Sequence, residues 1–387
     1  MDLPQIDRRS FLAALGHCAG GACFACALSR FDYSAAATGD DDIAIATGLD
    51  AKRQIDFYTQ LPDNHIQCFV CPLDCNLADG ETCFCRTRTN VGGKLYTRGY
   101  NNPCIIRVDP IEKLPLTHFR PGSETLTLSV GGCNVRCLYC QNWQQSQSKP
   151  DELKYFPLTP KQAVAAAKKK NIRTIAFTYT ETVAWLEWAH DVAVEAKKAG
   201  ISVVVATSAY IKTEPLLDFA QYVDGFVVGL KGFTEDFYKR ILGIQLAPVL
   251  EAIKTVRYKT DSWLELVNLV VPGYNDSSVE VQSMVQWVHE ELGDGVPLHF
   301  SRFVPMYRLA NVPRTPAQTL EKARSGALRA GLKHVYIGNL APHDGNNTYC
   351  PKCGCPVIER LGFKILKDTL RRGMCPQCKT KLPGVWT

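Results

Sequence analysis

The sequence predicts an α/β protein in which a parallel sheet curves into a partial or full barrel, with a small Cys-rich module before it and another after it. Two observations lead to this fold class. Apolar, β-branched runs alternate with helical periodicity from residue 125 to residue 304, and parallel strands need such helical crossovers. Of the 17 Cys, 16 fall into four short groups, far more than a core needs for packing.

The composition is typical of a globular protein. The 387 residues are 46% hydrophobic and 21% charged, which excludes a disordered, collagen-like or coiled-coil protein. Lys and Arg exceed Asp and Glu by 44 to 38, a net charge of +6. This mild excess does not indicate a nucleic-acid partner.

The first 37 residues resemble an export leader. Residues 7–12 read DRRSFL, similar to a twin-arginine signal, and Ala35 to Ala37 offer a cleavage site. The alternative is an amphipathic or disordered extension in which the Arg pair occurs by chance. Residues 38–65 are polar and Asp-rich and are expected to be a linker, followed by a Cys-rich module over 66–122.

The barrel is expected over residues 123–340. The predicted strands are 125–130, 174–179, 202–207, 225–230, 263–271 and 298–304, with a seventh at 334–338. The helix expected over 182–199 places Trp185, Trp188, Val192 and Ala196 on one stripe and ends at Gly200.

Reactive groups in such sheets gather at the carboxyl ends of the strands. Cys133 follows the first predicted strand, Glu181 the second, Ser208 the third and Lys231 the fourth. We therefore expect these residues to share one edge of the sheet.

The central motif is the run GGCNVRCLYC at residues 131–140, in which Cys133, Cys137 and Cys140 have the spacing C-x3-C-x2-C. Three thiolates can hold three irons of a [4Fe-4S] cluster, and since no fourth Cys follows nearby, one iron stays open for a small-molecule ligand. A zinc knuckle with a distant fourth ligand is the alternative, although zinc sites usually pair C-x2-C steps.

This spacing, with Tyr139 before the third Cys, resembles the signature of the radical S-adenosylmethionine (SAM) superfamily. Three further runs, DPIEKLPLTHF at 109–119, CQNW at 140–143 and PGYND at 272–276, resemble the AmmeMemoRadiSam-system radical SAM enzymes, relatives of pyruvate formate-lyase activating enzyme. The resemblance covers roughly residues 65–387 and implies a partial (β/α)6 TIM-like radical SAM barrel.

The resemblance also implies the chemistry. SAM binds the open iron, a low-potential electron donor reduces the cluster, and SAM is cleaved to methionine and a 5'-deoxyadenosyl radical that abstracts hydrogen from the substrate. No feature of the sequence identifies the substrate, but similarity to glycyl-radical activases makes a protein glycine a candidate. No catalytic residue of the chain is assigned.

The resemblance suggests Tyr139, Glu181, Ser208 and Lys231 as cofactor-binding residues. Relatives often have Asn-Glu-Pro where this chain has Thr-Glu-Thr at 180–182, Asn in place of Ser208, and an Asp-Leu-Lys type segment where Gly229 removes the carboxylate. The alternative for Glu181 is a helix N-terminal acid, and for Lys231 a surface lysine at a strand end.

The C-terminal module, residues 341–387, carries paired knuckles. Cys350, Cys353, Cys375 and Cys378 are expected to bind zinc tetrahedrally, with Cys355 as a spare thiol. The rivals are a rubredoxin-like iron site and a nucleic-acid-binding ribbon.

In the N-terminal module, Cys68, Cys71, Cys75 and Cys85 can supply a second site, for which structural zinc and an auxiliary Fe-S cluster are both open. Cys83 falls where relatives tend to have Gly.

Two other functions compete with a radical SAM enzyme: an iron-sulfur electron-transfer protein without SAM turnover, and a zinc-ribbon nucleic-acid adaptor. We expect the active site to work in the cytoplasm, where SAM and low-potential reductants occur. The leader makes a membrane tether or export an alternative.

Overall fold

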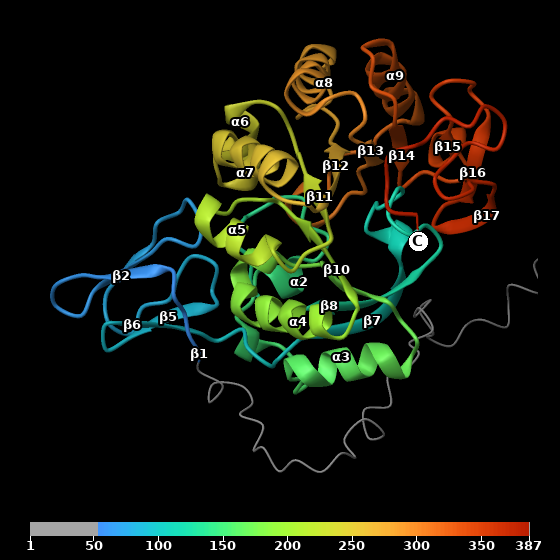
Figure 1. Cartoon of the computed structure of the whole chain (residues 1–387). Coiled ribbons are helices and arrows are strands. Elements are labelled where there is room, and N and C mark those ends of the chain that lie inside the picture. Colours follow the sequence, from blue (N-terminus) through green and yellow to red (C-terminus); the bar gives the residue numbers. More distant parts are fainter. Residues whose placement is uncertain (1–52, 387) are drawn as a thin grey trace, which may run out of the picture. The chain divides into compact units, whose positions relative to one another are not determined.

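A computed structural model describes residues 53–386 of the chain (Figure 1). The predicted leader, residues 1–37, and the first part of the predicted linker lie outside the described residues. Among residues 53–386, none of the helices combines the length and the apolar character that a membrane span requires.

An eight-stranded sheet forms the centre of the described chain and confirms the predicted α/β class. Its strands lie in the order β7-β8-β9-β10-β11-β12-β13-β14. From β8 to β14 all neighbours are parallel. The bounds are β7 Ile105–Pro110, β8 Glu124–Ser129, β9 Thr174–Phe177, β10 Ser202–Thr207, β11 Gly225–Gly229, β12 Trp263–Val270, β13 Leu298–Arg302 and β14 Val335–Gly338. All seven predicted strands are therefore present.

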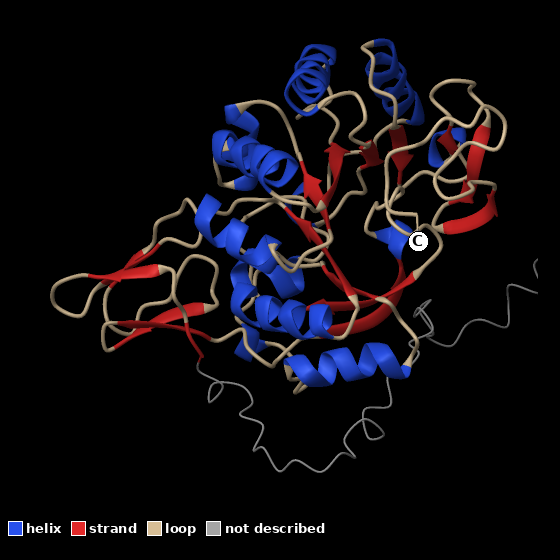
Figure 2. Ribbon diagram, in the orientation of Figure 1, coloured by secondary structure: helices blue, strands red, loops and turns tan. Residues whose placement is uncertain are grey.

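Helices cover the outer side of the curved sheet (Figure 2). They are α3 Pro160–Lys169, α4 Leu186–Lys198, α5 Thr213–Ala220, α6 Glu235–Phe237, α7 Leu246–Lys259, α8 Ser278–Leu292 and α9 Ala317–Arg329. A further short helix, α2 Trp143–Ser146, follows the loop after β8. Strands β9 and β11 are buried along their whole length, as expected for parallel strands covered on both faces.

The helix expected over 182–199 is divided into two parts. Residues Thr182–Trp185 form a 3-10 turn, and α4 follows directly. The Glu181 side chain caps this turn by accepting a hydrogen bond from the Val183 amide. The tight first turn holds the Glu181 carboxylate at the end of β9.

Strand β7 is an edge strand that the barrel prediction did not include. It pairs antiparallel with β8 along its whole length. An antiparallel neighbour needs only a return loop, whereas a parallel one needs a crossover helix, so the short segment 111–123 suffices to connect the two.

That connecting segment also fills the inside of the sheet. Ile111, Leu114, Leu116 and Phe119 are buried against residues of β9, β10 and β11. The run 109–119, noted in the sequence for its resemblance alone, thus supplies the apolar filling of the barrel.

A buried polar network lies beneath this filling. The carboxylate of Glu265 on β12 accepts hydrogen bonds from the amides of Thr117 and His118 and pairs with His299 Nε2 at 2.8 Å. His118 contacts the Tyr336 hydroxyl at 2.6 Å through its Nε2. His299 therefore belongs to the network on the amino-terminal side of the barrel and does not lie at the carboxyl ends of the strands.

The N-terminal module, here residues 53–97, consists of two small antiparallel sheets. One has the order β1-β6-β5 and the other β2-β3-β4. Their bounds are β1 Arg53–Gln54, β2 Tyr58–Gln60, β3 Ile66–Cys68, β4 Asn76–Leu77, β5 Arg88–Val91 and β6 Lys94–Thr97. Since β1 and β2 lie within the expected linker 38–65, that boundary is corrected: the folded module already includes Arg53.

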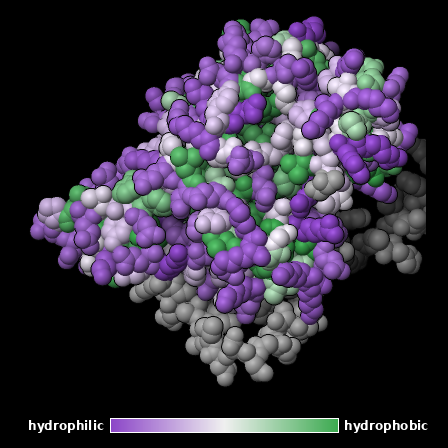
Figure 3. Space-filling view, viewed as in Figure 1, coloured by the Kyte–Doolittle hydropathy of each residue, from purple (hydrophilic) through white to green (hydrophobic). Residues whose placement is uncertain are grey.

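The C-terminal module, residues 341–386, contains the sheet β15-β16-β17, with β15 Thr348–Tyr349, β16 Pro356–Leu361 and β17 Lys364–Asp368. Its last residues return to the barrel, where the Val385 amide donates to the His118 carbonyl at 2.7 Å. On the face seen in Figure 3 the surface is largely hydrophilic, with apolar side chains in small groups.

Candidate active site

A cavity of about 450 Å³ opens at the carboxyl ends of the barrel strands. It is lined by the loop after β8 and by the ends of β9, β10 and β11. The predicted residues on its wall are Cys133, Cys137, Tyr139, Cys140, Glu181, Ser208 and Lys231. The structure thus brings all seven together, as the strand-end argument required.

The three-Cys loop, residues 131–140, is held on two sides. On one side the Arg136 amide donates to the Leu242 carbonyl at 2.9 Å. On the other the Cys133 amide donates to the Cys85 carbonyl at 3.2 Å. Gly132 allows this approach, because it has a φ of +95° and a Cβ there would lie 2.7 Å from the Cys85 carbonyl oxygen. The loop conformation is therefore fixed by its neighbours.

The Cys133 and Cys137 side chains are buried, each residue being 9% exposed. Burial raises the pKa of the Cys133 thiol, and it raises the pKa of Cys137 to about 11 against the opposing charge of Lys231. Thiols must lose their protons to bind metal, so metal binding at this loop releases protons.

The chemistry of this donor set fits a cluster with an open iron. In the part of the chain that the structure describes, the one group of potential ligands whose atoms all lie within 4.8 Å of one another is in the C-terminal module. The thiols of Cys133, Cys137 and Cys140 are therefore spread more widely than the ligands of a single ion, and they face a cavity large enough for a further ligand.

The Glu181 carboxylate links the ends of β9 and β10. It accepts hydrogen bonds from the Thr207 hydroxyl and, at 2.6 Å, from the Ser208 amide. Ser208 thus holds Glu181 through its backbone, and Thr207, which the sequence did not single out, holds it through its side chain. This makes Glu181 a buried, oriented acid on the cavity wall.

The Lys231 side chain lies over Gly229. A Cβ at position 229 would be only 3.2 Å from the Lys231 ammonium nitrogen. The Lys231 carbonyl accepts a 2.6 Å hydrogen bond from Asn275, which belongs to the run at 272–276. Gly229 therefore gives Lys231 the space to enter the cavity.

Tyr139 packs its ring between Phe237 and Phe303, with both ring centroids 6.5 Å away. Its hydroxyl is buried and has no hydrogen-bond partner among the described residues. Tyr139 lines the cavity, while its hydroxyl is enclosed and its hydrogen-bonding capacity is unused, which is uncommon for a buried polar group.

Three polar residues on the cavity wall were missed by the sequence reasoning. The Lys113 ammonium contacts Asp109 at 2.7 Å and the Tyr179 hydroxyl at 2.8 Å, and this hydroxyl donates to the other Asp109 oxygen at 2.7 Å. Tyr179 has a φ of +69°, an uncommon conformation for a bulky residue. The sequence signal was the run at 109–119, which carries Asp109 and Lys113.

The C-terminal module contributes Phe363, from the turn between β16 and β17, to the same cavity. This module therefore has two features of interest: a side chain at the active-site rim and a group of thiols.

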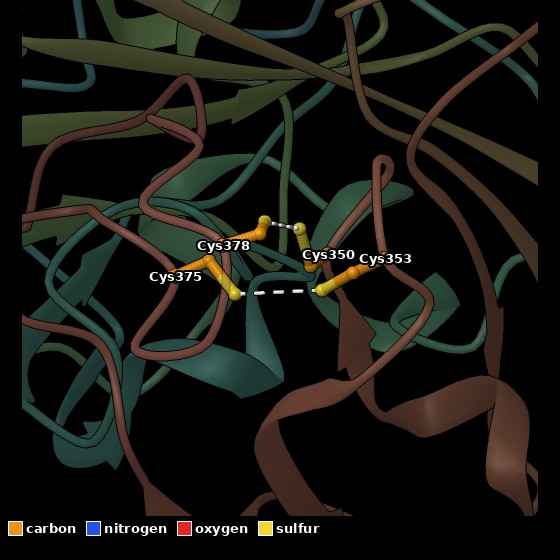
Figure 4. A group of neighbouring side chains, drawn as sticks. All are labelled: Cys350, Cys353, Cys375 and Cys378. Atoms are coloured by element: carbon orange, nitrogen blue, oxygen red, sulfur yellow. Dashed lines mark hydrogen bonds between the residues drawn. The ribbon is translucent and has the colours of Figure 1, made fainter.

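Those thiols come together as the paired knuckles predict (Figure 4). The sulfurs of Cys350 and Cys378 are 3.4 Å apart, and those of Cys353 and Cys375 are 3.7 Å apart. The Cys355 sulfur lies 3.4 Å from that of Cys375, but the four ligand atoms that all lie within 4.8 Å of one another belong to Cys350, Cys353, Cys375 and Cys378. Such short separations suit one tetrahedral ion.

In the N-terminal module, the expected set of Cys68, Cys71, Cys75 and Cys85 consists of three buried residues and the half-buried Cys75. Cys83, left out of that set, is buried in the same module.

Comparison with known proteins gives a family match over the barrel. The family model described as the radical SAM superfamily matches residues 127–283. An uncharacterized protein of Methanocaldococcus jannaschii is 44% identical over 332 residues, which covers 85% of this chain and 98% of the relative.

Among solved structures, Streptococcus suis SuiB bound to S-adenosylmethionine has 10% identity and a TM-score of 0.45, with 56% of this chain and 51% of that chain covered. A domain of pyruvate-formate lyase-activating enzyme from Bacteroides vulgatus has 14% identity and a TM-score of 0.37, with 42% and 98% covered.

Proposed function

Because the chain belongs to the radical SAM superfamily and is a SAM-dependent radical enzyme, we propose that Cys133, Cys137 and Cys140 hold its [4Fe-4S] cluster and that SAM occupies the adjoining cavity. When bound, this pair supplies a 5'-deoxyadenosyl radical that abstracts hydrogen from the substrate. One observation carries the assignment: the thiols of Cys133 and Cys137, which are buried, and of Cys140, which is half-buried, line a cavity at the carboxyl ends of the strands, and no fourth Cys is among the described residues that line it.

The residues around the thiols have separate tasks in this proposal. Glu181, oriented by Thr207 and Ser208, accepts a hydrogen bond from the SAM amino group. The positive charge of Lys231 offsets the negative charge of the thiolates, and Tyr139, which also lines the cavity, contacts the bound ligand. Leu114 and the rest of the apolar filling close the cavity from below and exclude water.

The test is SAM cleavage by the reconstituted full chain. The protein is loaded with iron and sulfide under anaerobic conditions and reduced with dithionite, and 5'-deoxyadenosine is measured by mass spectrometry. The variant with Cys133, Cys137 and Cys140 replaced by Ala should form none. Cys104→Ala is the matched control, because Cys104 lies at the start of the β7 edge and does not line the cavity. Cleavage by the triple variant would show that the cluster is elsewhere.

We propose a protein glycine as the substrate to test first, since the sequence resembles glycyl-radical activases. Reconstituted enzyme is incubated with SAM, reductant and a cell extract fractionated by size. A glycyl radical should give an electron paramagnetic resonance signal in a protein fraction, and air should then cleave that protein. A product found only in the small-molecule fraction would exclude this substrate.

For the leader, we propose that the active site works where SAM is present and that residues 1–37 act at most as a tether or partial export signal. Fractionation of cells that express the wild type or the variant Arg8→Lys with Arg9→Lys tests this. A wholly exported wild type that starts near Thr38 would contradict it.

A further inference from the structure

The C-terminal cysteine group has the dimensions of a site for one ion. The sulfurs of Cys350, Cys353, Cys375 and Cys378 all lie within 4.8 Å of one another (Figure 4). Four thiolates that bind one zinc ion at about 2.3 Å, at the corners of a tetrahedron, are roughly 3.8 Å apart. The two pairs of sulfurs, at 3.4 Å and 3.7 Å, fit this value. An iron-sulfur cluster would hold the thiolates farther apart, because each binds a different iron.

Two backbone turns of the same form carry these thiols. In each turn a Cys-Pro-x-Cys run is followed by a residue with left-handed backbone, Gly354 with a φ of +71° and Lys379 with a φ of +60°. The Gly354 amide donates to the Cys350 carbonyl at 2.9 Å, and the Lys379 amide donates to the Cys375 carbonyl at 3.0 Å. The two halves of the group are therefore built alike, as in a zinc site made from paired knuckles.

Cys355 is a neighbour of this group. Its sulfur lies 3.4 Å from those of Cys353 and Cys375, but it does not belong to the set whose sulfurs all lie within 4.8 Å of one another. Because all four ligands of a tetrahedral ion are close to one another, Cys355 is not expected to be a ligand. It therefore offers a matched control within the same module.

The thiols also take the place of an apolar core in this module. The buried cluster around them consists of Val357, Leu382 and two of the cysteines, Cys350 and Cys375. So small a core contributes little folding free energy, whereas an ion bound by four thiolates contributes much of it. Val357 belongs to β16, so this cluster joins the thiols directly to the hairpin of β16 and β17.

The C-terminal module contacts both edges of the barrel sheet, whose outermost strands are β7 and β14. On one side the Tyr336 hydroxyl of β14 donates to the Thr348 hydroxyl of β15 at 3.0 Å. On the other side Arg360 of β16 donates to the Thr117 carbonyl at 2.9 Å, and its guanidinium lies 3.8 Å from Glu112. Thr117 and Glu112 belong to the segment that follows β7. The module therefore spans the space between the two edges.

The turn of the β16–β17 hairpin brings Phe363 to the cavity. Phe363 lines the cavity together with Lys113, from the segment after β7, and Asn339, which follows β14. Ile365, two residues further on, lies against Gly122, where a Cβ would be 3.3 Å from its side chain. The hairpin is thus seated on the barrel at the point where its turn forms part of the cavity wall.

We propose that Cys350, Cys353, Cys375 and Cys378 bind one zinc ion, and that this ion holds the β16–β17 hairpin on the barrel so that Phe363 shields the cavity from solvent. The first knuckle lies between β15 and β16, and Cys375 of the second packs in the same cluster as Val357. The ion would thus fix the hairpin through both knuckles. Only the statement that the shielded cavity holds a cluster and SAM rests on the proposed function.

The metal is counted in full-length protein that carries Cys133, Cys137 and Cys140→Ala, so that the proposed active-site cluster does not contribute. Zinc and iron per chain are measured by mass spectrometry. Adding Cys378→Ser should remove one zinc ion per chain, whereas adding Cys355→Ser should leave the zinc content unchanged. Loss of iron in place of zinc would overturn the choice of metal. Zinc retained in the Cys378 variant, or lost equally in the Cys355 variant, would overturn the ligand set.

A second measurement uses the unmodified chain and does not depend on a variant folding. Cys353 is exposed, so a free thiol there would react readily with iodoacetamide. Native protein is alkylated with and without a zinc chelator, and the modified peptides are mapped. Cys353 should react at least tenfold faster after chelation. Rapid alkylation of Cys353 without chelator would contradict the proposal.

Hydrogen exchange tests whether the ion holds the hairpin. Peptides from residues 356–368 should exchange at least tenfold faster after zinc is removed, and peptides from β12, residues 263–270, should exchange at an unchanged rate. Equal exchange in the hairpin would refute this role of the ion, even if the zinc count supported the site.

The shielding by Phe363 is tested on protein reconstituted with iron and sulfide. Loss of the cluster's visible absorbance in air should be at least threefold faster in Phe363→Ala than in wild type. Leu366→Ala is the matched control, because Leu366 lies on the same hairpin, is 57% exposed and does not line the cavity. Equal rates in the two variants would refute the shielding. A chain that forms no cluster would contradict the proposed function, and the exchange measurement then decides the role of the hairpin.

Discussion

The ion pair between Arg88 and Glu187 joins the N-terminal module to the barrel, and Glu187→Gln should destabilise the protein strongly. The side chains are 2% and 10% exposed and their charged atoms are 2.8 Å apart. Removal of one partner from a buried pair costs about 3–5 kcal/mol, because the other charge stays buried. Since Arg88 keeps the Val183 carbonyl as an acceptor, we expect the lower end, about 3 kcal/mol.

The matched control is Asp236→Asn. Asp236 pairs with Arg240 at 3.0 Å, but both side chains are 71% exposed. Exposed pairs contribute about 0–1 kcal/mol, so the same carboxylate-to-amide change should have little effect here.

Urea unfolding followed by far-ultraviolet circular dichroism measures both variants, with the metal content of each sample determined first. Limited proteolysis locates the destabilised region. New cleavage sites should appear within residues 53–97 in the Glu187 variant and not in the Asp236 variant. Equal midpoints for the two variants would refute the argument that burial gives the Arg88 pair its importance.

Three further predictions concern pH, SAM and the C-terminal metal. Burial lowers the pKa of His118 to about 4 and that of His334 to about 3; since an unfolded His has a pKa near 6.5, the unfolded state binds more protons below pH 6.5. The free energy of unfolding should therefore fall from pH 6.5 towards pH 4, by about 2 kcal/mol for each of the two histidines at pH 5. The midpoint of urea unfolding should be lower at pH 5 than at pH 7, and identical midpoints would contradict this prediction. Glu181→Gln should weaken SAM binding by roughly 10-fold to 150-fold, which corresponds to the loss of a hydrogen bond to a charged group. Glu290→Gln, at an exposed position, should leave SAM binding unchanged. Titration calorimetry on reconstituted protein measures the SAM affinity of both variants. Cys375→Ser should remove one metal ion and open residues 341–386 to protease without loss of SAM binding, and an unchanged metal content would show that this residue is not a ligand.

The strands of the barrel could be predicted because their signal is local. A buried parallel strand is a short apolar, β-branched run, and β9 and β11 are buried at every residue. The shared edge at Cys133 and Glu181 followed from the same reasoning, since parallel strands point their carboxyl ends the same way.

Other features depend on residues that meet only in the folded chain. The bond from the Ser208 amide to Glu181 and the triad around Tyr179 join separate strands and loops, and the left-handed backbone of Tyr179 has no sequence signature. Cys83 was set aside because relatives tend to have Gly there, yet it is buried in the folded N-terminal module. Spacing identified the cysteine groups but could not say which thiols converge.

The return of the C-terminus to the barrel has a consequence for biosynthesis. The His118 imidazole contacts the Pro383 carbonyl, 265 positions later in the chain, and Val385 pairs beside it. At a translation rate of about 5–20 residues per second, roughly 13–50 s separate the synthesis of these two partners. During that interval the amino-terminal side of the barrel lacks this cover. Deletion of residues 383–386 should therefore leave a chain that is made at the normal rate but is captured by chaperones.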